Sequence, residues 1–191
     1  MSIETKNDLL KDLGLEDLST PTLDALIEGE SRYVKDLRMS LSGIRRSKEL
    51  NAKEQALIAL AIANNNHNKV LEAAFQKKAE AEGASKAEVA EALACTSLLS
   101  ANNVLYRFRH FMGKETYDRM PAGLRMNIMM NPVLGKEFFE LMSTAISAVN
   151  GCEACVRSHE SSLLKLDSKE KRIFDAVRLA AIITSLGKVI Y

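Results

Sequence analysis

The sequence is poor in residues that interrupt helices. Only three prolines and nine glycines occur among 191 residues, tryptophan is absent, and aromatic residues make up 5% of the chain. Alanine, leucine, glutamate and lysine, which have high helix propensity, are common instead. Because 47% of the residues are apolar, the chain can bury a sizeable core. We therefore expect a folded protein of the all-α class.

The sequence also lacks an excess of charge of one sign and a long apolar run. Its 26 basic residues nearly cancel its 25 acidic ones, so no strong field favours nucleic acid or an anionic membrane. No segment approaches the eighteen or so consecutive apolar residues of a membrane span. The start, residues 1–15, is acidic and polar, whereas a signal peptide is basic and then apolar. We expect a cytoplasmic protein with no nucleic-acid and no membrane partner.

Cysteine is scarce, and a nucleotide-binding glycine motif is missing. Three cysteines, two of them close together, do not match the larger even number of a secreted disulfide scaffold. A close pair in a reducing compartment indicates redox chemistry or metal binding. No Gly-x-Gly-x-x-Gly motif indicates a nicotinamide or flavin site, so we expect no cofactor. Reducing equivalents would arrive by thiol exchange with another protein or a small dithiol.

Apolar residues recur at helical spacing along almost the whole chain, and Gly, Asn and Pro mark the breaks. Ser85 with Glu88 has the pattern of a capping box, and Ser168 is expected to cap another helix. The stretch 119–132 is the least regular and is expected to connect two halves. The predicted helices are 5–13, 20–29, 31–46, 53–64, 67–82, 85–100, 102–112, 136–150, 152–165 and 168–186.

The two halves resemble each other, which suggests an internal two-fold duplication within one domain, residues 1–191. We expect a degenerate repeat at about 48–112 and a catalytic repeat at about 132–187. A shift of 86 residues aligns Glu54 with Glu140, and a shift of 84 aligns the later helices. The first shift also places Asn66, Lys69 and Ala73 at the positions of Cys152, Cys155 and His159.

A Cys-x-x-Cys-x-x-x-His motif carries the chemistry that we expect. Gly151 can end one helix in the left-handed conformation, which puts Cys152 at the start of the next helix. Unpaired backbone amides and the helix dipole stabilise a thiolate there. Cys155 lies one turn further on, close enough for a reversible disulfide. His159 shares a helix face with Cys155 and can accept its proton.

Glu140 is a less obvious member of this group. Its helix turns at Gly151 directly into the cysteine helix, so antiparallel packing could bring Glu140 towards His159. A solvated position on the helix surface is the alternative. We expect Cys152, Cys155, His159 and Glu140 to form the catalytic group.

Other interpretations of the cysteines remain open. Cys-x-x-Cys with a nearby His can bind zinc, and buried cysteines can be purely structural. Cys95, in an apolar helical stretch, is expected to serve packing. The methionines of the connector, Met126, Met129 and Met130, are expected in the core or at a subunit interface.

At these residues the chain resembles the AhpD alkylhydroperoxidase family of the carboxymuconolactone decarboxylase-like superfamily, close to the mycobacterial type. One position differs, since Ala154 stands where that type has a histidine directly before the second cysteine. The resemblance extends over nearly the whole chain. The segments that carry it are Asn102–Arg109, Gly123–Ile128, Asn131–Pro132, Phe139–Leu141 and Ser147–Cys152.

The resemblance implies an AhpD-like helical bundle, a homo-oligomer (trimer or hexamer) and the reduction of hydroperoxides or of a partner peroxiredoxin, AhpC. It also implies that electrons come from a lipoylated protein or another dithiol. The active site and proton relay of the family fall on Cys152, Cys155, His159 and Glu140.

The expected reaction begins with attack by Cys155 on the peroxide, which gives a sulfenic acid that condenses with Cys152 to a disulfide. An incoming dithiol would attack Cys152, which is nearer the helix start and is expected to be nearer solvent. A zinc-binding or non-catalytic interaction module and a lactone decarboxylase-like enzyme remain alternatives.

Overall fold

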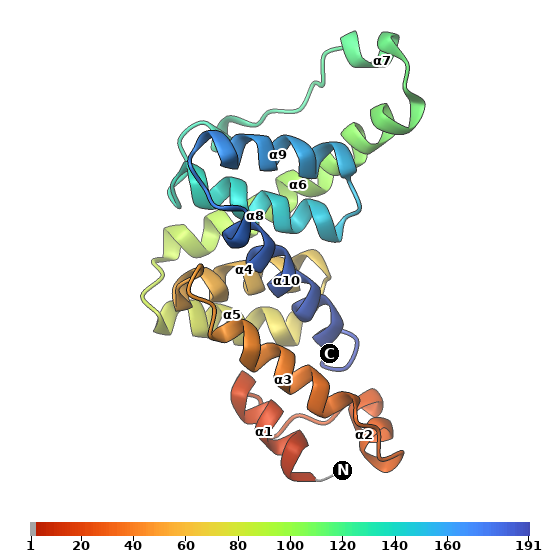
Figure 1. Ribbon diagram of the computed structural model, residues 1–191, viewed down its shortest axis with the longest axis vertical. Coiled ribbons are helices and arrows are strands. Elements are labelled where there is room, and N and C mark those ends of the chain that lie inside the picture. The colour runs from red at the N-terminus through yellow and green to blue at the C-terminus, as the bar shows by residue number, and fades with distance from the viewer. Residues whose placement is uncertain (1–2) are drawn as a thin grey trace.

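A computed structural model describes residues 3–191 as an all-helical chain, which confirms the predicted fold class. Within this range no strand is present and no helix is both long and apolar enough to cross a membrane. Figure 1 shows α1 and α7 at opposite ends of the long axis. The elements are α1 (Ile3–Leu13), α2 (Pro21–Glu28), α3 (Tyr33–Arg45), α4 (Ala52–Asn65), α5 (Lys69–Ala81), α6 (Lys86–Met112), α7 (Glu115–Arg119), the 3-10 turn η1 (Asn127–Met129), α8 (Lys136–Val149), α9 (Glu153–Lys165) and α10 (Glu170–Leu186).

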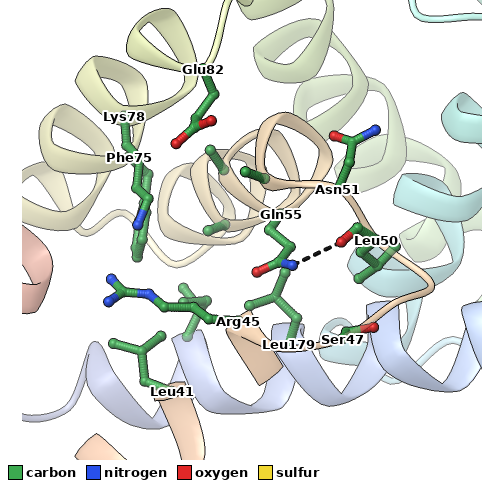
Figure 2. A pocket seen from close by; sticks show the side chains of 14 residues that line it. Leu41, Arg45, Ser47, Leu50, Asn51, Gln55, Phe75, Lys78, Glu82 and Leu179 are labelled. Carbon is green, nitrogen blue, oxygen red and sulfur yellow. Dashed lines mark hydrogen bonds between the residues drawn. The ribbon is translucent and has the colours of Figure 1, made fainter. Parts of the chain in front are cut away.

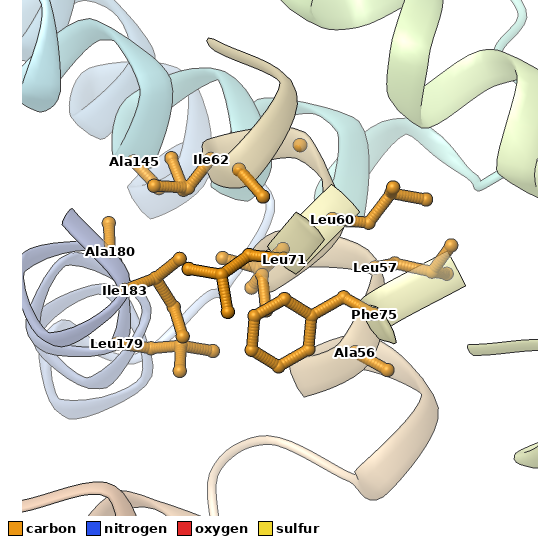
Figure 3. Packing of buried hydrophobic residues seen from close by; sticks show 14 of the residues in the cluster. Ala56, Leu57, Leu60, Ile62, Leu71, Phe75, Ala145, Leu179, Ala180 and Ile183 are labelled. Carbon is orange, nitrogen blue, oxygen red and sulfur yellow. The ribbon is translucent and has the colours of Figure 1, made fainter. Parts of the chain in front are cut away.

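Helix α4 is the centre of the core. Every residue from Ala56 to Ala63 is buried, so this helix has no polar face in its middle. A helix that is apolar all round requires neighbours on every side, and α5, α6, α8 and α10 provide them. Figure 3 shows Leu71 and Phe75 of α5 packed beside Leu179 and Ile183 of α10.

The helix boundaries repeat at a constant spacing, as the expected duplication requires. Helices α4, α5 and α6 begin 84 residues before α8, α9 and α10, at 52, 69 and 86 against 136, 153 and 170. The predicted shift of 86 for the first helix pair is therefore wrong, and one shift of 84 applies throughout. The mismatch arose because short side chains recur so often in α4 that several registers align equally well.

The corrected register changes the residues that match the catalytic group. His67 and Gly151 both have positive φ, at 56° and 68°, and each precedes the N-cap of the following helix. At a shift of 84, the counterparts of Cys152, Cys155 and His159 are Asn68, Leu71 and Phe75. Glu140 corresponds to Ala56. The first repeat thus holds an asparagine and three apolar core residues where the second holds titratable ones.

Helix α6 is one continuous helix of 27 residues, where the sequence predicted two helices with a break near residue 101. No glycine or proline interrupts it, and Asn102 and Asn103 are buried inside it. The predicted capping box of Ser85 and Glu88 is confirmed. The short α7 and η1 were not predicted, but the segment between α7 and α8 is otherwise irregular, as expected for the connector.

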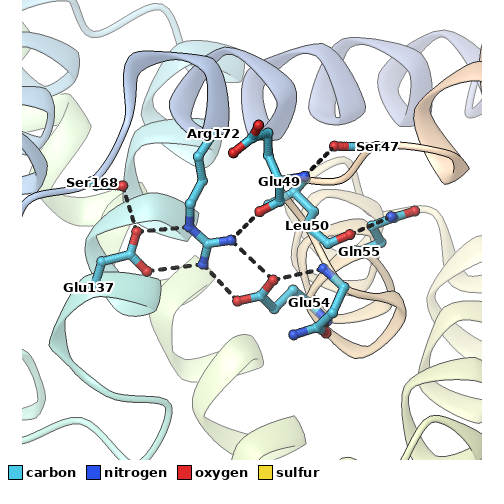
Figure 4. A network of polar contacts seen from close by, with 9 residues as sticks. Ser47, Glu49, Leu50, Glu54, Gln55, Glu137, Ser168 and Arg172 are labelled. Carbon is cyan, nitrogen blue, oxygen red and sulfur yellow. Dashed lines mark hydrogen bonds and ion pairs between the residues drawn. The ribbon is translucent and has the colours of Figure 1, made fainter.

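Arg172 ties the two repeats together (Figure 4). Its guanidinium donates to Glu54 of α4 at 2.6 Å and to Glu137 of α8 at 2.9 Å. It also donates to the backbone oxygen of Glu49, before α4. Ser168 does not cap α10 as predicted: its hydroxyl donates to Glu137 at 2.6 Å, and Lys169 takes the N-cap position without a side-chain bond. Long-range pairing with Glu137 outcompetes the local cap.

Candidate active site at the start of helix α9

The turn between α8 and α9 places the first cysteine. Gly151 adopts a φ of 68°, and the amide of Cys152 donates to the carbonyl of Ser147 at 3.1 Å. This is the pattern in which a left-handed glycine ends a helix. Cys152 is then the N-cap of α9, as the sequence predicted, and its sulfur lies beside the positive end of the helix dipole.

Cys152 and Cys155 are joined as a disulfide in the structure, with Cα atoms 5.3 Å apart. Cys152 is completely buried, whereas Cys155 is 6% exposed and lines a cavity. The expectation that Cys152 is the more accessible cysteine is therefore wrong. Helix α9 packs against α8 and α6, and Cys152 at its start is buried. Cys155, the third residue of α9, lines the cavity.

Glu140 and His159 lie in direct contact, although α8 and α9 supply one each. His159 Nδ1 and Glu140 Oε2 are 2.6 Å apart, and Lys136 Nζ donates to the other carboxylate oxygen at 3.0 Å. Glu140 is only 4% exposed, so the solvated alternative is wrong. Burial by itself would raise the pKa of Glu140, but the bonds from His159 and Lys136 outweigh it and hold this pKa below its ordinary value.

This contact decides which imidazole nitrogen can exchange a proton. A carboxylate that stays ionised can only accept hydrogen bonds, so Nδ1 of His159 carries a hydrogen. Nε2 is left free to accept or release a proton. His159 lines the same cavity as Cys155. The pair can therefore supply a base and then an acid next to a sulfur atom.

The cavity beside Cys155 has a volume of about 190 Å³. Its walls come from α6, α9 and the connector. The connector methionines were expected in the core or at a subunit interface: Met129 packs against the core, Met126 and Met129 line this cavity, and Met130 is 75% exposed. The lining residues are Asn102, Tyr106, Met126, Met129, Ala154, Cys155, Ser158 and His159.

Glu91 fixes the connector against α6 and was not identified from the sequence. Its carboxylate is buried and accepts from the backbone amides of Val133 and Leu134 at 2.8 and 2.6 Å. No local pattern could reveal this role, because the bonded groups are main-chain atoms about 42 residues away. The contact sets where the connector ends and thereby supports the wall that Met129 forms.

A larger cavity lies elsewhere, between α3, α4, α5 and α10 (Figure 2). Its volume is about 360 Å³, and apolar residues form most of its walls. Arg45 and Lys78 reach into it, and burial lowers the pKa of both. Its lining residues include no cysteine and no histidine. Size alone therefore does not identify the site, and the smaller cavity holds the reactive groups.

Cys95 lies in the core and bonds weakly to Ser143, with Sγ and Oγ 3.6 Å apart. Burial raises the pKa of its thiol to about 12. This agrees with the packing role predicted for it. Within residues 3–191 no three side chains of His, Cys, Asp or Glu are grouped as a metal site requires.

The sequence of this chain is similar to that of a known protein family and to those of two named proteins. The pattern of the carboxymuconolactone decarboxylase family matches residues 115–189. The chain is 40% identical over 161 residues to the alkyl hydroperoxide reductase AhpD of Anaeromyxobacter dehalogenans (strain 2CP-C), covering 84% of this chain and 86% of that protein. It is 37% identical to AhpD of Coxiella burnetii (strain Dugway 5J108-111) over 82% of this chain and 90% of that one.

A solved structure shares the fold at much lower identity. It is described as a gamma-carboxymuconolactone decarboxylase subunit from Burkholderia xenovorans LB400. The TM-score is 0.70 at 16% sequence identity, and the match covers 98% of this chain and 93% of the other. At this identity the likeness establishes the helical arrangement alone.

Proposed function

This chain belongs to the AhpD family, and on that premise we propose that it reduces alkyl hydroperoxides with the thiols of Cys152 and Cys155. The observation that carries the proposal is one cavity lined by both Cys155 and His159, with Glu140 bonded to that histidine. A thiol, a base and a carboxylate that orients the base are the parts that an activated nucleophile requires.

The reaction starts from the dithiol. His159 Nε2 accepts the proton of Cys155, and the thiolate attacks the terminal oxygen of the hydroperoxide. The sulfur–oxygen bond forms as the O–O bond breaks, and the alkoxide leaves with a proton from His159. Sulfenic acid on Cys155 then condenses with the Cys152 thiol, which releases water and gives the disulfide. Two electrons pass from the thiols to the peroxide.

We propose the route of disulfide reduction from the surroundings of the two cysteines. Cys155 is 6% exposed and lines the cavity, so an external dithiol that enters the cavity would meet it first, whereas Cys152 has no exposed surface. Its attack on Cys155 forms a mixed disulfide and releases Cys152 as a thiolate at the helix start, where backbone amides stabilise it. The second thiol of the donor then completes the exchange. This order differs from attack at Cys152, which the sequence alone suggested.

The partners follow from the family and from the chemistry. We propose a lipoylated protein or another dithiol as electron donor, and the peroxiredoxin AhpC as a further oxidised substrate. The chain would act in the reducing cytoplasm as a homo-oligomer, a trimer or hexamer. Exposed apolar side chains at the far end of α6, namely Phe108, Phe111 and Met112, are consistent with a subunit contact there.

Counting thiols tests this proposal. The reduced protein, mixed without oxygen with tert-butyl hydroperoxide, should lose two thiols per chain, and peptide mapping should find them at Cys152 and Cys155. Replacing either cysteine by serine should abolish turnover, while the variant that keeps Cys155 is still oxidised once. Full turnover by both variants would exclude the dithiol mechanism, and a lactone decarboxylase activity that survives loss of both thiols would replace it.

A further inference from the structure

Asn102 carries a buried amide oxygen that has no partner. The residue lies in the middle of α6 and is 5% exposed. Among the side chains of residues 3–191, its Oδ1 is the one buried oxygen or nitrogen that makes no hydrogen bond. Burial without a partner disfavours folding. A role outside the folding of the chain would explain why an amide occupies this position.

The nitrogen end of the same amide is held only weakly. Nδ2 of Asn102 donates to Sδ of Met126 at 3.2 Å. Thioether sulfur accepts hydrogen bonds weakly and cannot donate them, so the contact fixes which end of the amide is the nitrogen. The Cβ–Cγ torsion of asparagine is soft. The oxygen can therefore turn towards the cavity when a hydrogen-bond donor enters it.

Asn102 and Met126 both line the cavity that contains Cys155. At about 190 Å³ the cavity is smaller than the roughly 300–1,000 Å³ that accommodates drug-sized ligands. Met126, Met129 and Ala154 give it apolar walls. A ligand that suits it is small, has an apolar group and carries one donor that can satisfy the oxygen of Asn102.

We propose that Asn102 accepts the terminal O–H of a small alkyl hydroperoxide and so orients its O–O bond towards Cys155. This inference rests on the proposed function. The donated hydrogen is on the oxygen that the thiolate attacks, and that hydroxyl remains on sulfur as sulfenic acid. The alkoxide departs with the proton from His159. Asn102 exchanges neither protons nor electrons, so its role is to bind substrate.

Asn103, the next residue, provides a matched control. It is also buried on α6, but both ends of its amide are bonded. Its Nδ2 donates to Ser147 at 2.9 Å, and its Oδ1 accepts from Asn150 at 2.8 Å. An amide with both partners stabilises the fold, so the two neighbours should respond differently to the same substitution.

The test replaces each asparagine by leucine, which has similar volume and no acceptor. Pre-reduced protein is mixed with tert-butyl hydroperoxide in a stopped-flow instrument, and thiol loss is followed without oxygen. Asn102→Leu should slow oxidation about tenfold, the effect of roughly one hydrogen bond. Its Tm should be unchanged or higher, and reduction of its disulfide by dithiothreitol should stay within about twofold of wild type. Asn103→Leu should lower the Tm.

Two results would overturn the role of Asn102 while leaving the proposed function intact. One is oxidation of Asn102→Leu at the wild-type rate. The other is a lower Tm with equal slowing of oxidation and reduction, because Asn102 would then hold the fold together through a bound water. A wild-type protein that keeps both thiols in hydroperoxide would instead overturn the proposed function, and this inference with it.

Discussion

At the scale of single residues, the protonation state of a buried titratable group depends on the partners that its side chain contacts. Glu140 is buried, yet its contacts with His159 and Lys136 keep it ionised. Cys95 is buried without such a partner, and its thiol remains neutral. Two buried acidic groups on neighbouring helices thus end in opposite protonation states, because only Glu140 has Lys136 and a histidine N–H donating to it.

Removing either member of the Glu140–His159 pair should slow turnover. Glu140→Gln leaves the imidazole without an ionised acceptor, and His159→Phe removes the base. General acid–base assistance is typically worth about a hundredfold to ten-thousandfold, so steady-state rates should fall within that range. Raising the pH should restore part of the loss, because hydroxide then deprotonates the thiol. An equal loss at every pH would indicate that the pair positions the substrate instead.

Cys95 should resist alkylation in the folded protein. With its pKa raised to about 12 by burial, only about one molecule in ten thousand carries the thiolate at pH 8. Iodoacetamide at pH 8 should therefore leave Cys95 unlabelled in the reduced folded chain and label all three cysteines after unfolding in guanidinium, as peptide mapping measures. Rapid labelling of Cys95 in the folded state would show that the core around it opens.

At the scale of elements, the connector depends on contacts that lie far away in sequence. Residues 120–135 are almost without regular structure but supply Met126 and Met129 to the cavity. Their position is supported by Glu91, whose carboxylate bonds the backbone of Val133 and Leu134. An irregular segment can form a defined wall when its own backbone groups are bonded to a rigid helix.

Glu91→Ala should loosen the connector and slow the enzyme. The substitution leaves two backbone amides without their acceptor, which disfavours the ordered connector locally. Amide exchange at Val133 and Leu134 should accelerate, and oxidation by hydroperoxide should slow several-fold as the cavity wall moves. Glu80→Ala, at an exposed position on α5, is the control and should change neither quantity. Unchanged exchange at those two amides would contradict the role of Glu91.

At the scale of the whole molecule, α10 joins the two repeats and α3 (Figure 1). Arg172 is the polar part of that junction, since it bonds Glu54 in the first repeat and Glu137 in the second. Burial alone would raise the pKa of Glu137, but hydrogen bonds from Arg172 and Ser168 outweigh it and lower this pKa. Ionised Glu137 therefore stabilises the folded state.

Arg172→Met should destabilise the protein by about 2–3 kcal/mol at pH 7, because it leaves two half-buried carboxylates without their shared cation. A lowered pKa means that the stabilisation is present above the unfolded value of about 4.5 and is lost as the pH falls through the folded value. The difference between wild type and variant in denaturant unfolding should therefore shrink below about pH 4.5.

A surface ion pair is the control for that measurement. Arg119 pairs with Glu115 on α7, and both side chains are about three-quarters exposed. Arg119→Met should change the free energy of unfolding by less than about 0.5 kcal/mol. A difference for Arg172→Met that stays constant down to pH 3 would mean that a contact independent of the two carboxylates, such as the hydrogen bond to the backbone oxygen of Glu49, holds the repeats together.

The sequence by itself determined the features that depend on local spacing. Helix propensity and apolar periodicity gave the helical class and most helix positions. Gly151, Cys152, Cys155 and His159 follow one another through a helix end and the next helix turns, so their relative placement is local. Glu140 was predicted to lie near His159 on the assumption that consecutive helices pack antiparallel. The 2.6 Å contact between the two side chains agrees with that assumption.

Only the tertiary structure decided features that depend on distant contacts. The burial of Cys152 and the linkage by Arg172 both depend on which helix faces meet. The same holds for Glu91 and Asn102, whose surroundings come from a connector with no periodic pattern of its own. Hydrophobic burial and hydrogen bonding between segments far apart in sequence determine where these side chains lie. Local helix propensity does not depend on such distant contacts, so it could not predict them.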